Sequence, residues 1–119
     1  MTSRRVLISD DAAYVRLALR RIVSAHGWDV VGEAENGAQA VALYKALAPD
    51  LVLMDIEMPE MDGISAIRAI LQASPEAKIV VCAAMSKNNQ IQEAVAAGAR
   101  DYIVKPFRDE KVWETLSAA

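Results

Sequence analysis

The sequence predicts an α/β three-layer sandwich in which five parallel strands alternate with five helices. Three observations predict it: five short apolar runs, a helical repeat of apolar residues after each run, and Gly or Pro near several element ends. Strands covered on both faces are apolar without alternation, as in parallel sheets. Right-handed βαβ connections then place helices on both faces of such a sheet.

The apolar runs mark the strands. They occupy residues 6–8, 29–34, 51–54, 79–82 and 102–104, and the second of them contains the pair Val30-Val31. Each run is shorter than a typical helix, and most of them lack the polar alternation of a half-exposed strand. The runs therefore predict strands of one buried sheet.

Amphipathic patterns between the runs mark the helices. In the first pattern, apolar residues stand at positions i, i+4, i+7 and i+8, which are Val15, Leu19, Ile22 and Val23. Gly27 follows as a helix C-cap. Similar spacing appears at 41–48, 64–71, 91–95 and 112–116. The second of these patterns follows the turn signal Asn36-Gly37 and ends before Pro49.

Length and composition indicate a single domain, residues 1–119, that folds without a structural metal or a disulfide. Residues of apolar type make up 54% of the 119, and a domain of this size buries roughly two-thirds of its unfolded surface. The single cysteine, Cys82, cannot form an internal disulfide, which is typical of a reducing compartment.

Charge and hydropathy exclude several functions. The net charge is −3, from 16 acidic and 13 basic residues, and the basic ones are dispersed. This pattern argues against a nucleic-acid-binding surface. No apolar stretch approaches the roughly 20 residues that a membrane helix needs, and the run after Arg4 and Arg5 is too short for a signal peptide. We expect a cytoplasmic protein with no membrane contact.

Charged residues follow three of the predicted strands. Asp10 and Asp11 follow the first, Asp55 ends the third and Lys105 ends the fifth. If the strand order is 2-1-3-4-5, these side chains converge in one crevice at the carboxyl edge of the sheet. Crowded carboxylates need protonation or a cation, and oxygen ligands favour Mg²⁺. A single Asp after a strand is often only a turn former. The convergence of three Asp residues and a Lys favours a functional site.

Three segments carry a resemblance to a known family: residues 6–11, 50–63 and 97–107. Together they resemble the receiver domain of two-component response regulators, and the similarity covers essentially the whole chain. It is greatest to the stand-alone chemotaxis members of the family. The resemblance implies a flavodoxin-like (βα)5 sandwich with a parallel sheet of order 2-1-3-4-5.

The resemblance also implies roles for individual residues. Asp55 resembles the phosphoacceptor, which takes its phosphoryl group from a phosphohistidine of a histidine kinase or from a small acyl phosphate. Asp11 and Asp55 would bind Mg²⁺ directly, Asp10 partly through water, and Glu57 through its backbone carbonyl. Lys105 would pair with a phosphoryl oxygen. Phosphoryl uptake and loss would be self-catalysed, so we expect no enzyme acting on a separate substrate.

Other family features are expected in the loops beside the site. The Lys105-Pro106 bond resembles one that is cis in the family, a form that only X-Pro bonds adopt at low cost. Pro59 and Gly63 resemble residues that shape the loop after the third strand, and ordinary turn formation accounts for them as well.

One position departs from the family pattern. The end of the fourth strand usually carries Thr or Ser, but counting back from Lys105 places Ala83 there. Alanine offers no hydroxyl to a phosphoryl group. If the register differs by one residue, Cys82 takes this position. Tyr102 matches the aromatic residue that rotates inward on activation, so we expect Ala83 to weaken the coupling between phosphorylation and Tyr102.

The output surface is expected on the fourth helix, fifth strand and fifth helix. Ile91 and Val95 share a helix face in the predicted pattern, and Ala99 and Tyr102 lie near the last strand. The resemblance implies that a downstream protein, such as the flagellar motor switch, binds a monomer here. A purely structural role in the core remains an equal alternative for Ile91 and Val95.

Three alternatives stay open. An FMN-binding flavodoxin shares the strand order but needs a phosphate loop where Asp10 and Asp11 stand. An aspartyl phosphatase would carry its acidic motif after the first strand, with cap segments. Within the family, the chain could be a receiver domain excised from a multidomain DNA-binding response regulator.

Overall fold

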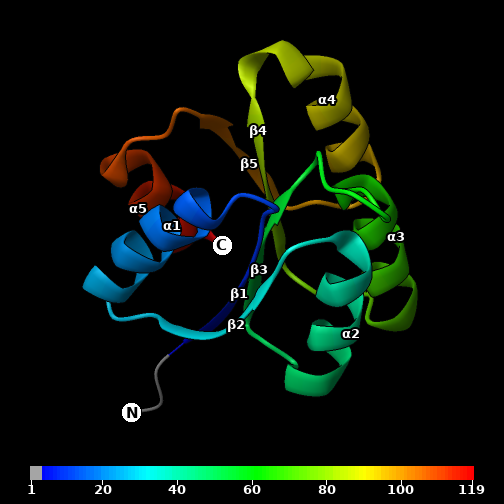
Figure 1. The fold of residues 1–119 in the computed structure, drawn as a ribbon, viewed down its shortest axis with the longest axis horizontal. Coiled ribbons are helices and arrows are strands. Elements are labelled where there is room, and N and C mark those ends of the chain that lie inside the picture. Colours follow the sequence, from blue (N-terminus) through cyan, green and yellow to red (C-terminus); the bar gives the residue numbers. More distant parts are fainter. Residues whose placement is uncertain (1–3) are drawn as a thin grey trace.

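The computed structural model describes residues 4–119, over which strands and α-helices alternate (Figure 1). Residues 1–3 of the predicted 1–119 domain lie outside the described residues. In chain order the elements are β1 Arg5–Ser9, α1 Ala13–Ala25, β2 Asp29–Ala34, α2 Gly37–Leu47, β3 Leu51–Asp55, α3 Gly63–Ala73, β4 Ile79–Ala84, the short 3-10 helix η1 Met85–Lys87, α4 Asn88–Ala96, β5 Asp101–Lys105 and α5 Asp109–Ala118.

The strands form one parallel sheet of order β2-β1-β3-β4-β5, which confirms the predicted order. Along β3, Met54 pairs with Ser9 of β1 and Asp55 pairs with Cys82 of β4. The ends of β1, β3 and β4 are therefore level with one another. Because all strands run the same way, their carboxyl ends meet at one edge of the sheet.

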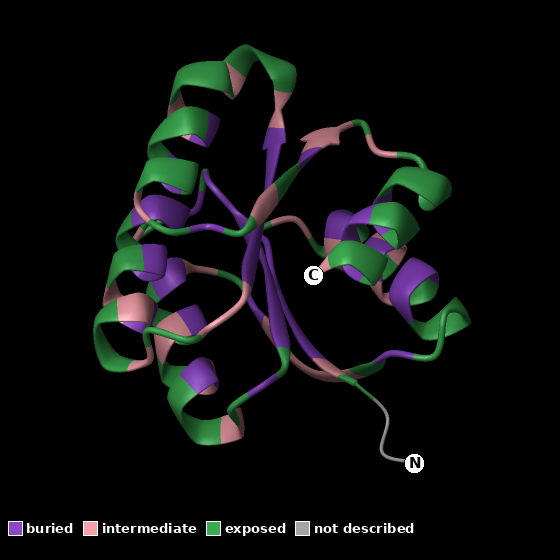
Figure 2. Ribbon diagram, turned by 180° about the vertical axis from the view of Figure 1, so that it is seen from behind, coloured by how far each residue is buried: buried purple, intermediate pink, exposed green. Residues whose placement is uncertain are grey.

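Two hydrophobic cores lie on opposite faces of the sheet. Helices α1 and α5 cover one face, and α2, α3 and α4 cover the other (Figure 1). Successive strand residues serve the two cores in turn: Leu7 belongs to the α2–α4 side, and Val6 and Ile8 belong to the α1–α5 side. Every residue of β3 is buried, and the inner strands β1, β3 and β4 form the buried centre of the molecule (Figure 2).

Side-chain caps begin two of the helices. Asn36 Oδ1 accepts the Gln39 backbone N–H at 2.8 Å, and Asp62 Oδ1 accepts the Ser65 N–H at 2.8 Å. Asn36-Gly37 was predicted to be a turn, but the structure uses it to start α2, because Asn is a favoured helix N-cap. Both helices approach the carboxyl edge of the sheet with their N-termini.

Gly63 allows a close approach between α3 and β3. Its N–H donates to the Ile56 carbonyl at 2.8 Å, and a Cβ added at Gly63 would overlap the carbonyl oxygen of Asp55. The predicted loop-shaping role of Gly63 thus has a steric basis. The Lys105-Pro106 peptide bond is cis, as expected.

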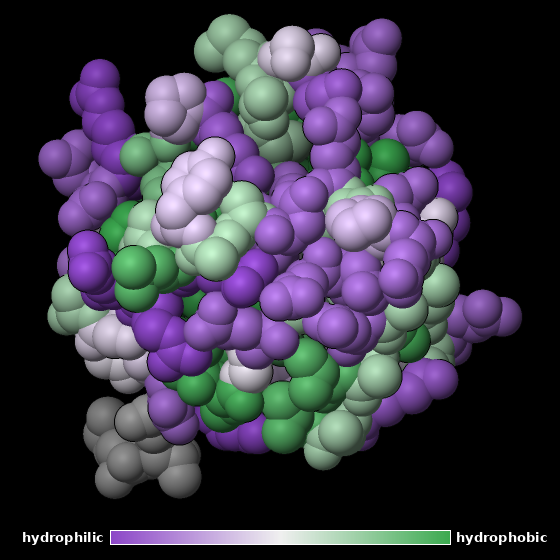
Figure 3. All heavy atoms as spheres, in the orientation of Figure 1, coloured by the Kyte–Doolittle hydropathy of each residue, from purple (hydrophilic) through white to green (hydrophobic). Residues whose placement is uncertain are grey.

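The surface of the described chain is mixed in character. Hydrophilic side chains cover much of the centre of the face in Figure 3, and hydrophobic ones gather on the left, where α1 and α5 lie, and along the lower part, where α2 lies. Helices α1 and α5 carry the exposed side chains of Tyr14, Leu17 and Trp113. Within residues 4–119, none of the helices combines the length and apolar character required to cross a bilayer.

Candidate functional site: an acidic pocket at the carboxyl edge of the sheet

The predicted acidic residues meet at the carboxyl edge. Asp10 and Asp11 follow β1, and Asp55 ends β3. One carboxylate oxygen from each of the three lies within 4.8 Å of the others. Asp10 and Asp55 are buried, whereas Asp11 is exposed at the rim. The adjacency of β1 and β3 brings these residues together, as the predicted strand order required.

Lys105 joins this group from β5. Its Nζ atom lies 2.8 Å from Asp10 Oδ2 and 3.2 Å from Asp55 Oδ1. Strand β5 pairs with β4, where Lys105 is opposite Ala84, so the side chain reaches past the end of β4 to the carboxylates. The predicted convergence of Asp10, Asp55 and Lys105 is therefore present in the structure.

The backbone around Asp10 is held by several contacts. Asp10 Oδ1 accepts the Ala12 N–H at 2.9 Å, and the Asp10 N–H donates to the Ala34 carbonyl at 3.0 Å. Arg16 of α1 donates from Nη1 to the Asp10 carbonyl at 2.7 Å and from Nε to Glu33 at 3.0 Å. Helix α1 and strand β2 thus fix the position of one acidic side chain.

Burial and charge shift the ionisation of two groups. Burial raises the pKa of Asp55 to about 6; the charge of Asp10 adds to this effect, and Lys105 opposes it. Burial alone would lower the pKa of Lys105. The hydrogen bonds and negative charges of Asp10 and Asp55 outweigh burial, so the pKa of Lys105 lies above its ordinary value. Asp55 is mostly ionised at neutral pH, and Lys105 is protonated.

The donor set of the pocket fits Mg²⁺. Three carboxylates offer oxygen atoms within reach of one ion, and hard oxygen ligands are those that Mg²⁺ prefers. Burial raises the pKa of Asp55, and the charge of Asp10 adds to this effect despite the nearby Lys105 ammonium group. A divalent cation would balance the negative charge of the carboxylates.

The pocket around these groups has a volume of about 230 Å³. Its lining includes Ala83, which lies at the end of β4 and is buried. Cys82 points instead into the α1–α5 core, where burial raises the pKa of its thiol to about 12. Ala83 rather than Cys82 therefore faces the acidic pocket, in agreement with the register counted from Lys105.

Glu57 and Lys87 close one side of the pocket. Both line it, and the Lys87 ammonium group contacts the Glu57 carboxylate. Glu57 was predicted to contribute only its backbone carbonyl, and Lys87 was not predicted at all. Lys87 is four residues after Ala83, in η1, and a sequence gives no indication of which way a side chain in such a connection points.

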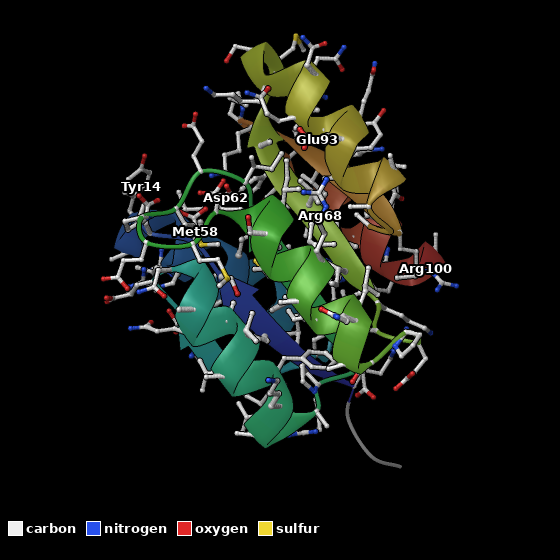
Figure 4. All side chains as sticks on the ribbon, turned by 90° about the vertical axis from the view of Figure 1, so that its right-hand side faces the viewer. Tyr14, Met58, Asp62, Arg68, Glu93 and Arg100 are labelled. Atoms are coloured by element: carbon white, nitrogen blue, oxygen red, sulfur yellow. The ribbon has the colours of Figure 1, made fainter. Side chains whose placement is uncertain are left out.

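A larger cavity of about 600 Å³ adjoins the acidic pocket and shares Asp11, Ile56 and Glu57 with it. It lies between α3 and α4, where Arg68 and Glu93 point toward one another with Nη2 and Oε1 3.4 Å apart (Figure 4). Met58 and Asp62, from the loop after β3, line its other side (Figure 4). Pro59, predicted to shape this loop, lines the cavity as well.

The predicted output face is only partly exposed. Val95 and Tyr102 are each 44% exposed, but Ile91 and Ala99 are buried. Of the two alternatives considered for these residues, the core role applies to Ile91 and does not apply to Val95. The short helix α4 packs through Ile91 and Ala94, so Val95 lies at the edge of the buried stripe and turns to solvent.

The chain belongs to the response regulator receiver domain family, whose model matches residues 6–117. Several relatives are named chemotaxis protein CheY. The Thermotoga maritima protein is 53% identical over 114 residues, covering 96% of this chain and 95% of the relative. The Bacillus subtilis protein is 50% identical over 115 residues, covering 97% and 96%.

A solved structure agrees with this family membership. The crystal structure of the CheX-CheY-BeF3-Mg²⁺ complex from Borrelia burgdorferi has a TM-score of 0.92 and 31% sequence identity, and the match covers 97% of this chain and 87% of that chain. Receiver domains use Mg²⁺ at a cluster of aspartates, and Asp10, Asp11 and Asp55 form such a group here.

Proposed function

We propose that this protein is a phosphorylation-dependent signalling switch in which Asp55 accepts a phosphoryl group. The observation that carries the proposal is the position of the Asp55 carboxylate: it ends the buried strand β3, 3.2 Å from the Lys105 ammonium group and beside Asp10 and Asp11. A carboxylate placed between a cation site and an ammonium group can attack phosphorus.

The phosphoryl step uses these residues in distinct roles. An Asp55 carboxylate oxygen forms a bond to phosphorus while the bond from phosphorus to the donor breaks. With a phosphohistidine donor that is protonated on its other ring nitrogen, the electron pair of the P–N bond stays on the nitrogen that carried phosphorus, and neutral imidazole leaves. Lys105 donates to a phosphoryl oxygen. Hydrolysis later returns the Asp55 carboxylate and releases inorganic phosphate.

Asp11 and Asp55 would bind Mg²⁺ directly, Asp10 partly through water, and Glu57 through its backbone carbonyl. The ion, when bound, stabilises the negative charge that develops on the transferred group. The remaining contribution comes from positioning by the chain itself. Arg16 and the Ala12 N–H hold Asp10, and Gly63 lets α3 approach the end of β3.

The proposed partners are a histidine kinase as donor and a downstream protein as target. The protein would act as a cytoplasmic monomer, with one domain over residues 1–119, and its own phosphate turnover would be self-catalysed. The surface of α4, β5 and α5 would carry the signal, with Val95 and Tyr102 as its exposed apolar side chains. High identity to chemotaxis proteins supports a chemotaxis-like output, such as the flagellar motor switch.

Intact-mass analysis after treatment with acetyl phosphate and Mg²⁺ tests the phosphoacceptor. The expected result is a single added phosphoryl group on the unaltered chain, decaying with time and absent when EDTA is added. Asp55→Asn is expected to gain no mass. Labelling of Asp55→Asn to the same extent, or repeated turnover of a phosphate ester, would contradict the proposal.

A further inference from the structure

A second lysine lies at the same pocket as the phosphoacceptor. Lys87 ends η1, which connects β4 to α4 at the top of Figure 1. Its side chain is 31% exposed and lines the pocket that also contains Asp55, Ala83 and Lys105. Lys87 is therefore placed both at the reacting group and at the start of a helix on the proposed output face.

The ion pair between Lys87 and Glu57 is weak, so Glu57 competes poorly with another anion for the Lys87 ammonium group. This ammonium group contacts the Glu57 carboxylate, whose side chain is 65% exposed. Ion pairs with such solvent access contribute little, because water screens both charges. The long, flexible lysine side chain can therefore leave Glu57 when a stronger anion appears nearby.

The charge of the pocket changes when Asp55 is phosphorylated. Among its described lining residues, four carboxylates face two ammonium groups, and the carboxylates are those of Asp10, Asp11, Asp55 and Glu57. A phosphoryl group at neutral pH carries about two negative charges, where the Asp55 carboxylate carried one. A divalent cation balances the unphosphorylated pocket, and the added charge then needs a further donor.

Ala83 cannot be that donor, because its side chain has no polar atom. Lys105 already contacts Asp10 and Asp55. Lys87 is the other cation among the residues that line the pocket in the described chain, and its present partner is exposed.

We infer that Lys87 is a second phosphoryl-binding residue, held by Glu57 in the unphosphorylated protein and transferred to a phosphoryl oxygen when Asp55 is modified. This inference rests on the proposed function of Asp55. The exchange breaks the contact between Glu57 and Lys87 and forms a charge-assisted hydrogen bond to the phosphoryl group. Because Lys87 directly precedes α4, the exchange moves the start of that helix and replaces the coupling that a hydroxyl at Ala83 would have given.

Beryllofluoride, a non-covalent mimic of the phosphoryl group, tests the inference in the presence of Mg²⁺. Binding is followed by fluorine NMR for the unaltered chain, Lys87→Met, Lys87→Arg and Lys45→Met. Lys45 is an exposed lysine of α2, so its replacement removes the same charge away from the pocket. Lys87→Met is expected to weaken beryllofluoride binding about tenfold, whereas Lys87→Arg and Lys45→Met are expected to retain it.

Two further measurements separate this role from a general loss of charge. Mg²⁺ binding without beryllofluoride is expected to be unchanged or tighter in Lys87→Met, because a positive charge has left the pocket. Glu57→Gln is expected to tighten beryllofluoride binding several-fold, because it releases Lys87. Equal beryllofluoride affinity in Lys87→Met and the unaltered chain overturns the inference, and so does equal weakening in Lys87→Met and Lys45→Met.

The outcomes also distinguish the inference from the proposed function. If the unaltered chain binds beryllofluoride and gains a phosphoryl mass while Lys87→Met behaves identically, only the role of Lys87 is wrong. If the unaltered chain neither binds beryllofluoride nor gains mass, the proposed function and the role of Lys87 are both wrong.

Discussion

The Nζ atom of Lys105 lies closer to Asp10 than to the proposed phosphoacceptor Asp55, at 2.8 Å from Asp10 Oδ2 against 3.2 Å from Asp55 Oδ1. The ammonium group is therefore shared between the carboxylate of Asp10 and the carboxylate that is proposed to be modified. Before the proposed reaction, the Lys105 ammonium group would compete with Mg²⁺ for the two carboxylates. During the reaction, it would donate to the phosphoryl group.

Lys105→Met should accordingly change two properties in opposite directions. Mg²⁺ should bind several-fold more tightly, because the positive charge that competes for Asp10 and Asp55 is gone. Phosphoryl uptake from acetyl phosphate should slow by about tenfold or more, because a donor to the transferred group is lost. Calorimetry measures the first effect and intact mass the second. Tighter Mg²⁺ binding together with an unchanged uptake rate would argue against a role for Lys105 in the reaction.

The pKa of Asp55 predicts how stability depends on pH without metal. Its pKa is about 6 in the folded chain and near its ordinary 3.8 when unfolded. The folded state therefore holds this proton more tightly than the unfolded state does. The contribution of Asp55 to the free energy of unfolding falls as the pH rises from about 4 to 6 and does not change further above pH 6. Asp55→Asn removes this loss and should be more stable than the unaltered chain above pH 6, by about 1–2 kcal/mol after allowance for solvent in the pocket.

Urea unfolding in EDTA at several pH values measures the effect of Asp55→Asn. The stability difference from the unaltered chain should vanish near pH 4 and shrink when Mg²⁺ is added. Glu114→Gln, on the exposed surface of α5, provides a control that also removes one carboxylate. A difference that stays constant from pH 4 to pH 7 would show that the effect of Asp55→Asn comes from packing and not from ionisation.

Ala83→Thr should strengthen the link between the phosphoryl site and Tyr102. The added hydroxyl faces the pocket and can donate to a phosphoryl oxygen, which Ala83 cannot. The change in the Tyr102 ring shifts on adding beryllofluoride and Mg²⁺, measured by NMR, should be larger in this variant. Ala83→Val has nearly the same shape without the hydroxyl and is the matched control. Equal shift changes in the threonine variant and the unaltered chain would refute the prediction.

Arg16 and Arg20 offer a matched pair for testing how Asp10 is positioned. Both bind Glu33, but Arg16 also donates to the Asp10 carbonyl. Arg16→Met should lower the free energy of unfolding by about 1–2 kcal/mol, because it leaves a partly buried acceptor without its partner, and it should weaken Mg²⁺ binding. Arg20→Met should leave Mg²⁺ affinity unchanged. If the two variants bind Mg²⁺ alike, Arg16 does not position the site.

Most of the strands were predictable because they are apolar runs in a sheet covered on both faces, and the order 2-1-3-4-5 was implied by the resemblance to receiver domains. The acidic residues were predictable for a related reason: they directly follow those runs, so the parallel sheet determines where they meet. The sequence did not show that Asp10 is buried while Asp11 is exposed, because adjacent residues at a strand end diverge by local turn geometry.

Side chains on α4 and in η1 were harder to predict. Ile91 and Val95 share an i, i+4 spacing, but the depth of packing depends on which neighbours the helix meets. Lys87 lies in a polar connection without periodicity, and its direction depends on the exposed Glu57 side chain across the pocket. Both features follow from tertiary contacts, which a local pattern does not encode.

The burial of β3 along its whole length determines how a signal could leave the site. A charge added at Asp55 is attached to the most constrained strand of the sheet, with packed side chains on both sides, so the attachment point cannot shift to relieve the new repulsion. The adjustment must occur in the connections that border the pocket, of which the segment from β4 to α4 carries both a cation and a helix start. Under the proposed function, the central sheet would serve as a fixed support against which the outer helices are repositioned.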